Sequence, residues 1–451
     1  MFNADKNLME KWAPVLEHTD VPSIQDSHKQ AVTARLLENQ EIAAREEAVA
    51  KSNTFLGEDA PANATGANVA GFNPVLISLV RRAMPNLIAY DIAGVQPMTG
   101  PTGLIFAMKS KYSTQDGTEA LFDEANTAFS GQQTPAVTQE AGPSGLESAV
   151  DNGDGNLGTN ETAGEIVSDY AGGLSTAAAE ALGTGGSGGN FGEMAFSIEK
   201  ATVTAKSRAL NAEYTMELAQ DLKAIHGLDA QGELANILSS EILAEINREV
   251  VRTVNRTAKL GAQQVSTAVG GIFNMNTDSD GRWLAEKAKG LIIQIEREAN
   301  VIAKETRRGK GNYVICSSDV ASVLAASGML DYSPALASNL NVDDTGNTFA
   351  GVLNGKFKVY VDPYATGDYV CVGYRGTTPY DAGVFYCPYV PLTMVKAIGE
   401  EDFQPRIGFK TRYGMVANPF VATDGTVGAD RENPYFRIFR VDGIMGDAPA
   451  S

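Results

Sequence analysis

The sequence predicts an α+β protein with two or three domains, and three observations support this fold class. The chain has 451 residues, more than a single hydrophobic core usually organises. The longest helical pattern in the chain extends from Asp229 to Leu260. Strand-like runs dominate the C-terminal part, where the pair Asn354-Gly355 marks a tight turn between two of them.

The N-terminal segment 23–51 is predicted to be one charged helix. Apolar residues recur there roughly at helical spacing, and glycine and proline are absent. The apolar stripe is thin and has no partner within the segment. Because a helix of this kind must bury its stripe, we expect it to bundle with copies of itself or with another chain.

Shorter elements follow. Residues 74–84 are predicted as a short helix and residues 104–112 as a strand leading outward. Residues 113–192 are rich in Gly, Ala, Ser and Thr and poor in Lys and Arg, which indicates a weakly packed surface insertion. Residues 196–206 alternate like a strand, and a helix that Gly227 ends comes next.

The predicted helix from Asp229 to Leu260 is about 45 Å long, at about 1.5 Å for each residue. Asp229 is its expected N-cap and Gly261 its stop. A rod of this length should support elements packed on one face, with Ile246 on that face and Arg248 on another. The apolar stripe consists of residues four apart: Leu234, Leu238, Ile242, Ile246, Val250 and Val254.

The remaining chain mixes helices and strands. Two helices are predicted, an amphipathic one over 283–306 and a capped one that starts at Ser318. The predicted strands are 312–316, the hairpin 349–362, and the runs 368–374, 382–392, 403–420 and 435–444.

The composition argues against catalysis and against tight binding to DNA. The formal charge is −19, whereas proteins that bind nucleic-acid phosphates gain affinity through Lys and Arg. Only three histidines occur, although most acid–base chemistry depends on this residue. Residues 183–188 match GxGxxG by letter, but no strand precedes them and no helix follows, so a nucleotide site is not indicated. We expect no catalytic residue, metal or cofactor.

The cysteine content and the hydropathy indicate the redox state of the thiols and whether a membrane span is expected. Cys316, Cys371 and Cys387 are too few and too scattered for a disulfide framework or a zinc cage, so reduced thiols are expected. Because the chain contains no run of 18 apolar residues, we expect no membrane span.

Several long stretches together resemble one family, the major capsid proteins of T-even-type contractile-tailed bacteriophages. They are 79–110, 205–255, 349–365, 381–393 and 403–420, in the family's order. The resemblance fades in the segment that carries the insertion. It implies the coat-protein fold shared by tailed phages and herpesviruses, with an N-arm, an extended loop, a peripheral domain with a long spine helix, an axial domain and an inserted domain.

The resemblance also implies domain boundaries. These are a scaffold-interacting propeptide removed on maturation (1–58), the N-arm (59–93), the start of the extended loop (94–112), the insertion (113–192), the peripheral domain with the spine helix (193–265), the axial domain (266–395), and a return to the peripheral domain with the C-terminal strands (396–451).

The implied function is that of a major capsid protein. Such a protein forms hexameric capsomers of an icosahedral or prolate phage head around double-stranded DNA, and it is found in the virion after assembly in the host cytoplasm. One alternative is the paralogous capsid vertex protein, which forms pentamers. The other is an enzyme such as a hydrolase, against which the scarcity of histidine argues.

Maturation is expected to involve one cut. The resemblance implies that a prohead protease cleaves after Leu or Ile, a small residue and Glu. Leu56-Gly57-Glu58 fits, with the cut before Asp59, where a helix gives way to a stretch of small residues. Similar triplets end at Glu10, Glu38, Glu245, Glu286 and Glu400. The first two have bulky middle residues, and those ending at Glu245 and Glu286 lie in predicted helices, which must unfold locally before cleavage.

The expected partners follow from the same resemblance. They are further copies in hexamers and neighbouring capsomers, the vertex protein, an internal scaffold, the prohead protease, a folding chaperone, decoration proteins, and packaged DNA that is enclosed without specific binding. A membrane is not among them.

Overall fold

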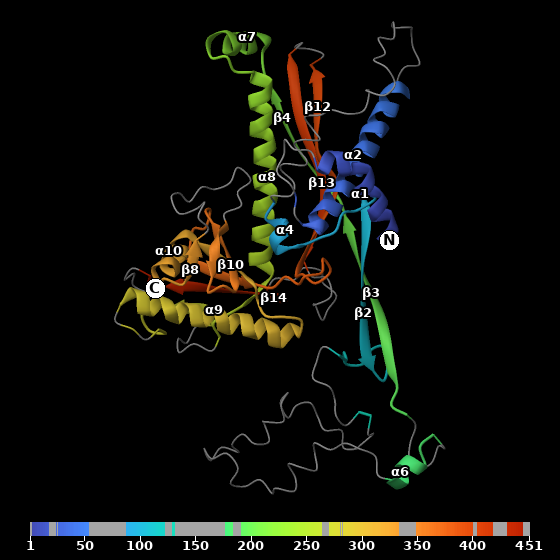
Figure 1. Cartoon of the computed structure of the whole chain (residues 1–451), viewed down its shortest axis with the longest axis vertical. Helices are drawn as coiled ribbons and strands as arrows, with labels where there is room; N and C mark the ends of the chain where they lie inside the picture. The colour runs from blue at the N-terminus through green and yellow to red at the C-terminus, as the bar shows by residue number, and fades with distance from the viewer. Residues whose placement is uncertain are drawn as a thin grey trace. The chain divides into compact units, whose positions relative to one another are not determined.

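The chain is mixed α+β, as expected (Figure 1). It forms two compact units, Met1–Ile105 with Ala201–Ser451, and Phe106–Lys200. Within the described residues, no helix is long and apolar enough to cross a membrane. The computed structural model describes residues 2–17, 24, 26–53, 87–121, 129–130, 176–183, 191–263, 270–279, 281, 283–332, 349–399, 404–417 and 431–444.

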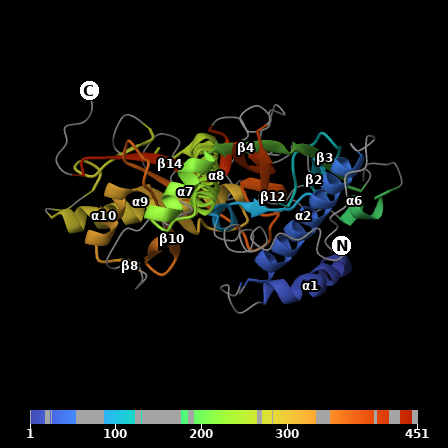
Figure 2. The same cartoon turned by 90° about the horizontal axis from the view of Figure 1, so that it is seen from above.

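Two helices begin the first unit, α1 (Phe2–Leu16) and α2 (Ser27–Asn53). Helix α2 confirms the helix predicted over 23–51, and it starts where an Asp26 carboxylate oxygen accepts from the His28 N–H at 3.0 Å. Helix α1 was not expected. It lies alongside α2 (Figure 2), and the Trp12 indole donates to Glu38 at 3.1 Å.

The expectation that α2 finds its partner in another chain is wrong. Val32, Leu36 and Leu37 are at most 2% exposed, and they share one hydrophobic core with Ile92 and Leu392 of the same chain. Sequence periodicity reveals that a stripe must be buried, but it does not reveal against which surface.

A four-stranded sheet has the order β1-β12-β13-β4. Strand β1 runs parallel to β12, and the other pairs are antiparallel. Helix α4 precedes β1, and α7 follows β4. The bounds are α4 (Ala89–Ile92), β1 (Gly94–Val95), β4 (Lys206–Glu213), α7 (Met216–Ile225), β12 (Val384–Ile398) and β13 (Pro405–Ala417).

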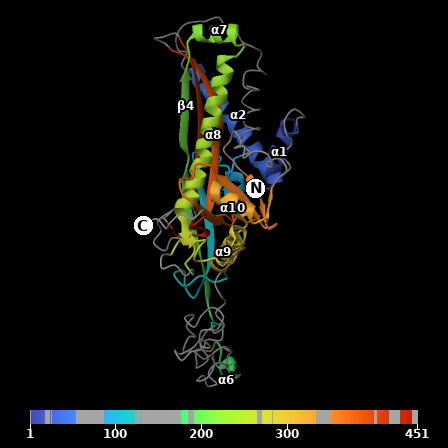
Figure 3. The same cartoon turned by 90° about the vertical axis from the view of Figure 1, so that its left-hand side faces the viewer.

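The long predicted helix is α8 (Ala230–Thr257), which runs along β4 (Figure 3). As predicted, Asp229 is its N-cap and accepts from the Gln231 N–H at 3.3 Å. The helix ends earlier than predicted, because residues 258–260 turn into β5 (Ala258–Leu260) and pair with β14. Gly261 is therefore not the helix stop. Its N–H donates to the Ile438 carbonyl at 2.8 Å, and a Cβ there would lie 3.1 Å from Glu298.

An eight-stranded sheet has the order β5-β14-β11-β7-β10-β9-β8, with β6 paired to β14. The predicted turn between β9 and β10 is confirmed, since Asn354 and Gly355 both adopt positive φ, 51° and 65°. The bounds are β6 (Ile272–Asn274), α9 (Leu284–Thr306), β7 (Tyr313–Ser317), α10 (Ser318–Ala326), β8 (Leu330–Tyr332), β9 (Phe349–Leu353), β10 (Phe357–Asp362), β11 (Tyr369–Gly373) and β14 (Asn433–Asp442).

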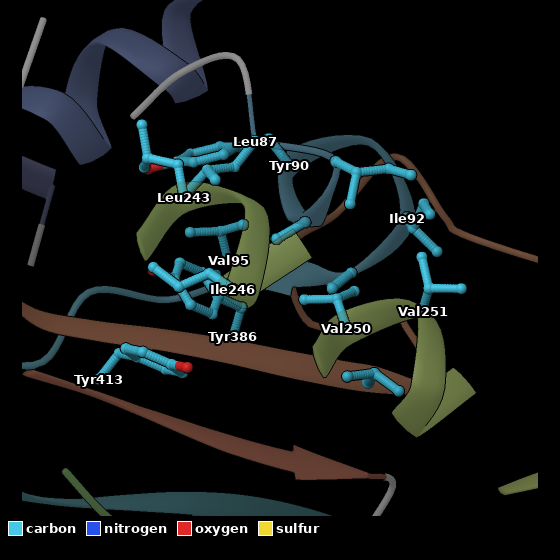
Figure 4. Packing of buried hydrophobic residues seen from close by; sticks show 14 of the residues in the cluster. Leu87, Tyr90, Ile92, Val95, Leu243, Ile246, Val250, Val251, Tyr386 and Tyr413 are labelled. Carbon is cyan, nitrogen blue, oxygen red and sulfur yellow. The ribbon is translucent and has the colours of Figure 1, made fainter. Parts of the chain in front are cut away.

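The largest core of the first unit lies between α8, the α4–β1 segment and the four-stranded sheet (Figure 4). Ile242, Ile246, Val250 and Val254 of the predicted stripe are at most 1% exposed. Leu234 and Leu238 are only half-buried, because they lie in the N-terminal part of the helix. A second core forms where α9 and α10 pack on the eight-stranded sheet.

The second unit contains most of a two-stranded sheet formed by β2 (Thr102–Tyr112) and β3 (Met194–Thr204). Both strands confirm predictions. Of the predicted insertion 113–192, the described part includes the short helix α6 (Thr176–Glu180) and the ring of Phe129, 4.6 Å from that of Tyr112. The helix predicted over 74–84 lies outside the described residues.

Candidate assembly surface

The β2–β3 sheet of the second unit has a face of large apolar side chains, opposite a face that carries an ion pair. Lys109 Nζ lies 3.1 Å from the Glu199 carboxylate, so these odd-numbered residues share a face. Side chains alternate along a strand, which places even-numbered residues on the opposite face. That face carries large apolar side chains that are 55–70% exposed: Phe106, Met108, Met194, Phe196 and Ile198.

This apolar hairpin face, defined by those five side chains, is unusual for an isolated chain. Exposed apolar residues scattered singly are common, but a contiguous row on a narrow sheet marks a contact surface. A two-stranded sheet is also marginally stable by itself. Both arguments indicate that the face is covered when the protein is in its functional state.

A second apolar surface lies in the first unit, at α7 and the start of α8. Thr215 caps α7 by accepting from the Leu218 N–H at 3.3 Å. All residues of α7 are described, and none is buried. Because an isolated helix of this length is marginal in water, it needs packing from a partner. Five apolar side chains of α7 and the stretch after it are 46–75% exposed: Met216, Leu218, Ile225, Leu228 and Ile237.

Charged side chains on α8 fasten the helix to the four-stranded sheet. The Arg208 guanidinium on β4 lies 2.9 Å from Glu245 and 2.6 Å from Glu249. Tyr413 on β13 donates to Glu249 as well. Burial and the hydrogen bond to Glu249 raise the pKa of Tyr413, so its hydroxyl remains a donor at neutral pH. This network is structural, because it joins three elements and leaves no free base.

The same helix contacts the eight-stranded sheet through the side chain of Arg248. Its guanidinium donates to both carboxylate oxygens of Asp362 on β10, at 2.7 Å each. Tyr369 donates to the same carboxylate at 2.7 Å. Arg248 was expected only to lie on a different face of α8 from Ile246, and the structure shows that this face contacts the eight-stranded sheet. Its long side chain reaches a residue that is distant in sequence, which helical periodicity cannot show.

The predicted cleavage residues Leu56, Gly57, Glu58 and Asp59 lie outside the described residues. Four of the competing triplets end at residues that are described, and the first two, Glu10 and Glu38, lie in α1 and α2. Glu245 lies inside α8, and Glu286 lies in the first turn of α9, where its carboxylate accepts from the Trp283 N–H at 3.4 Å. Both are helical, as predicted.

The thiols follow expectation. Cys316, Cys371 and Cys387 are buried and unpaired, and burial raises the pKa of each to about 12. They are therefore unreactive thiols of the core. Across the described ranges, no group of three or more His, Cys, Asp or Glu side chains is placed to hold a metal ion.

Sequence reasoning missed both apolar surfaces. The alternation in 104–112 and 196–206 identified strands, and the outward residues of both strands are visible in it. The pattern alone does not show which of the two faces is covered by the chain itself, because both faces of β2 carry apolar residues.

Comparison with known proteins identifies a family match over most of the chain. The family described as major capsid protein Gp23 matches residues 69–441. The major capsid protein of Serratia phage KSP90 is 44% identical over 420 residues, which cover 91% of this chain and 90% of that protein. The major capsid protein of Enterobacteria phage T4 is 38% identical over 516 residues, which cover 97% and 98%.

Two further matches are weaker. The capsid vertex protein of Enterobacteria phage T4 is 30% identical over 245 residues, which cover 51% of this chain and 54% of that protein. Among solved structures, the capsid of Myoviridae Phage XM1 matches with a TM-score of 0.37 and 8% identity over 79% of this chain and 92% of that chain. Similarity at this level does not establish a shared fold.

Proposed function

The chain belongs to the major capsid protein Gp23 family, and from this premise we propose that it is the hexamer-forming subunit of a phage head. Proteins of this family are structural components of the virion, so the chain is a capsid protein and not an enzyme. The capsomers would tile an icosahedral or prolate shell around double-stranded DNA.

The extent of the matches favours the hexamer protein over the vertex protein. The similarity to the T4 major capsid protein covers 97% of the chain, whereas the similarity to the T4 vertex protein covers 51%. A subunit of hexamers is thus the better-supported of the two capsid alternatives.

The apolar hairpin face is the observation that carries the assembly proposal. Each of its side chains is more than half exposed, so covering one stabilises the assembly by about 1–2 kcal/mol. A neighbouring copy of the subunit can cover this face with apolar side chains of its own. Each subunit in a ring then has one such neighbour, so the contact is repeated around the ring. Many modest contacts then add up to a stable shell.

The surface at α7 and the start of α8 provides a second contact. It lies in the first unit, and Ile225 and Ile237 are 75% and 60% exposed. A subunit that belongs to a closed ring and also to a continuous shell needs more than one kind of contact. We assign the hairpin face to contacts within a capsomer and the α7 surface to contacts between capsomers.

The domain proposal follows the coat-protein fold. We propose that α8 with the four-stranded sheet is the peripheral domain and that α9, α10 and the eight-stranded sheet are the axial domain. The expected boundary at residue 395 falls inside β12, and β14 belongs to the eight-stranded sheet. The proposed axial domain therefore includes 433–442 and leaves out residues 384–395 of β12, which belong to the four-stranded sheet.

Maturation is proposed to remove residues 1–58 by a cut between Glu58 and Asp59. The triplet before this bond and the change in composition after it support the assignment. Before the cut, these residues would link each subunit to an internal scaffold, and a prohead protease would act on all of them. The vertex protein, a folding chaperone and decoration proteins complete the proposed partners, and the packaged DNA is enclosed without specific binding.

Native mass spectrometry and electron microscopy test this function. The full chain, co-expressed with a phage capsid chaperone, is expected to give hexameric rings and closed or tubular shells. Pentamers without hexamers would favour the vertex alternative. A monodisperse monomer at all concentrations would contradict a role as a shell subunit.

A further inference from the structure

We propose that the body of the subunit, meaning residues 87–105 and 201–444 of the first unit, is a binding site for the α1–α2 helix pair that survives cleavage of the chain. After the proposed cut at Glu58, the fragment 1–58 would remain bound without a covalent link. Its release would then be a separate step from proteolysis. This inference rests on the proposed removal of residues 1–58, and it adds a step, the release of the fragment, at which maturation can be regulated.

The α1–α2 helix pair packs against the body through buried apolar side chains. Trp12, Leu36 and Leu37 are 5%, 0% and 1% exposed, and they belong to the same hydrophobic cluster as Tyr90 and Leu392 of the body. Apolar side chains buried to this extent stabilise an interface whether or not a linker joins its two sides.

Asn39 gives the contact its specificity. Its buried amide donates to the Met98 carbonyl at 2.8 Å and to the Tyr389 carbonyl at 2.9 Å, so both N–H groups are used. Tyr389 lies where the register of β12 against β13 shifts, between Pro388 and Val390. The Asn39 side chain of α2 thus donates a hydrogen bond to the backbone carbonyl of Tyr389, at the register shift in β12.

Charge adds a second specific contact at the start of α2. Lys29 Nζ lies 3.3 Å from the Asp91 carboxylate and 5.9 Å from the centre of the Tyr90 ring. Both partners belong to α4 of the body. The site therefore recognises a helix that presents buried apolar side chains together with a lysine and an asparagine ten residues apart.

The linker and the interface contribute differently to binding. In the intact chain, the linker keeps the helices at a high effective concentration near the body, and cutting the chain removes only this advantage. The buried core and the Asn39 bonds are unchanged by a cut at a distant peptide bond. Once released, the helices lose their packing, and isolated helices are marginal in water, so rebinding is disfavoured.

An engineered cut in the full chain tests this inference. The recognition sequence of a site-specific endoprotease is inserted between Glu58 and Asp59, the purified chain is cut, and the products are separated by size-exclusion chromatography. The fragment 1–58 is expected to co-elute with the remainder. Elution of the fragment as a free peptide directly after the cut would overturn the inference.

Three variants show whether the observed contacts are responsible. Asn39→Leu keeps the approximate shape and removes both donors, and at least tenfold faster loss of the fragment is expected. Lys29→Met is expected to give a smaller acceleration without touching the core. Ile42→Ala is the control, because Ile42 is 46% exposed on the same helix. Equal retention of all four proteins would also overturn the inference.

The result is independent of the proposed function. The experiment needs neither the prohead protease nor shell formation, so early loss of the fragment would leave the capsid role intact. Conversely, a failure to form hexamers would not change the retention of the cut fragment.

Discussion

Arg248 on α8 donates two hydrogen bonds of 2.7 Å each to Asp362 on β10, and it thereby joins α8 to the eight-stranded sheet. The Asp362 side chain is 3% exposed and that of Arg248 is 26% exposed. On the other flank, Glu245 and Glu249 of the same helix bind Arg208 of the four-stranded sheet. Helix α8 is thus the element that connects both sheets of the first unit.

Replacing Arg248 by glutamine should therefore destabilise the fold. The carboxylate of Asp362 would remain buried with a weaker partner, and we expect a loss of about 2–3 kcal/mol in the free energy of unfolding. Urea unfolding followed by circular dichroism measures it. Arg252→Gln, one turn later at an exposed position, should stay within about 0.5 kcal/mol of the parent. Equal stability of both variants would show that the Asp362 contact contributes nothing.

Ile246→Asp should abolish soluble protein. The side chain is 1% exposed in the core of Figure 4, so a carboxylate there would be buried without a partner, at a cost of about 4 kcal/mol or more. The matched control is Ile237→Asp on the same helix, since Ile237 is 60% exposed. Its soluble yield should equal that of the parent, although its assembly should be impaired. Normal yield for Ile246→Asp would contradict the packing of α8.

Charge on the apolar hairpin face should prevent assembly without unfolding the subunit. The double variant Phe106→Asp, Ile198→Asp places carboxylates on two side chains that are 64% exposed each. We expect a folded, soluble subunit that forms no rings, because a neighbour would have to bury both charges. Glu199→Gln on the opposite face is the control and should assemble. Normal rings from the double variant, seen by electron microscopy, would refute the proposed contact.

Acid should loosen the α1–α2 helix pair through His28. Burial lowers its pKa below 6.5, and nearby Arg375 lowers it further, whereas Asp26 and the Val95 backbone act in the opposite direction. The undocked state therefore binds more protons than the docked state in the window between the lowered pKa and 6.5. Docking should be complete above about pH 6.5 and weaken as the pH falls through that window.

Trp12 fluorescence can follow this pH response. The chain has two tryptophans, so a Trp283→Phe background leaves Trp12 as the reporter, and its buried indole should become exposed on undocking. The emission is expected to shift to longer wavelength between pH 7.5 and 5.5. In the His28→Gln variant this shift should be smaller. An identical shift in both proteins would exclude His28 as the cause.

Glu58→Gln should block maturation. The variant keeps the shape of the side chain and removes its charge, so the proposed protease would lose its recognition element. We expect precursor shells that retain residues 1–58 and do not fill with DNA, as shown by N-terminal sequencing and electron microscopy. Glu10→Gln, at an exposed glutamate in another triplet, should be processed normally. Shortened subunits that begin at Asp59 in the Glu58→Gln particles would refute the assignment.

The sequence by itself determined the family and many of the helices and strands, although α1 was not among them. The period of Ile242, Ile246, Val250 and Val254 predicted the buried stripe of α8, and Asn354-Gly355 predicted a turn that the structure confirms. These features depend on residues close together in the chain, where side-chain spacing and backbone preference act directly. The long motifs of the capsid family were also readable in order along the chain.

Only the tertiary structure decided what each element packs against. It placed the stripe of α2 against the subunit itself, joined Asn39 to Tyr389, and brought Arg248 to Asp362 across 114 residues. It also showed that the apolar hairpin face of β2 and β3 stays uncovered in the single chain. Local periodicity shows which face of a helix or strand must be buried. The surface that buries it is formed by residues distant in sequence. Because the hydrophobic effect is not directional, an apolar face by itself does not specify which of these surfaces it contacts.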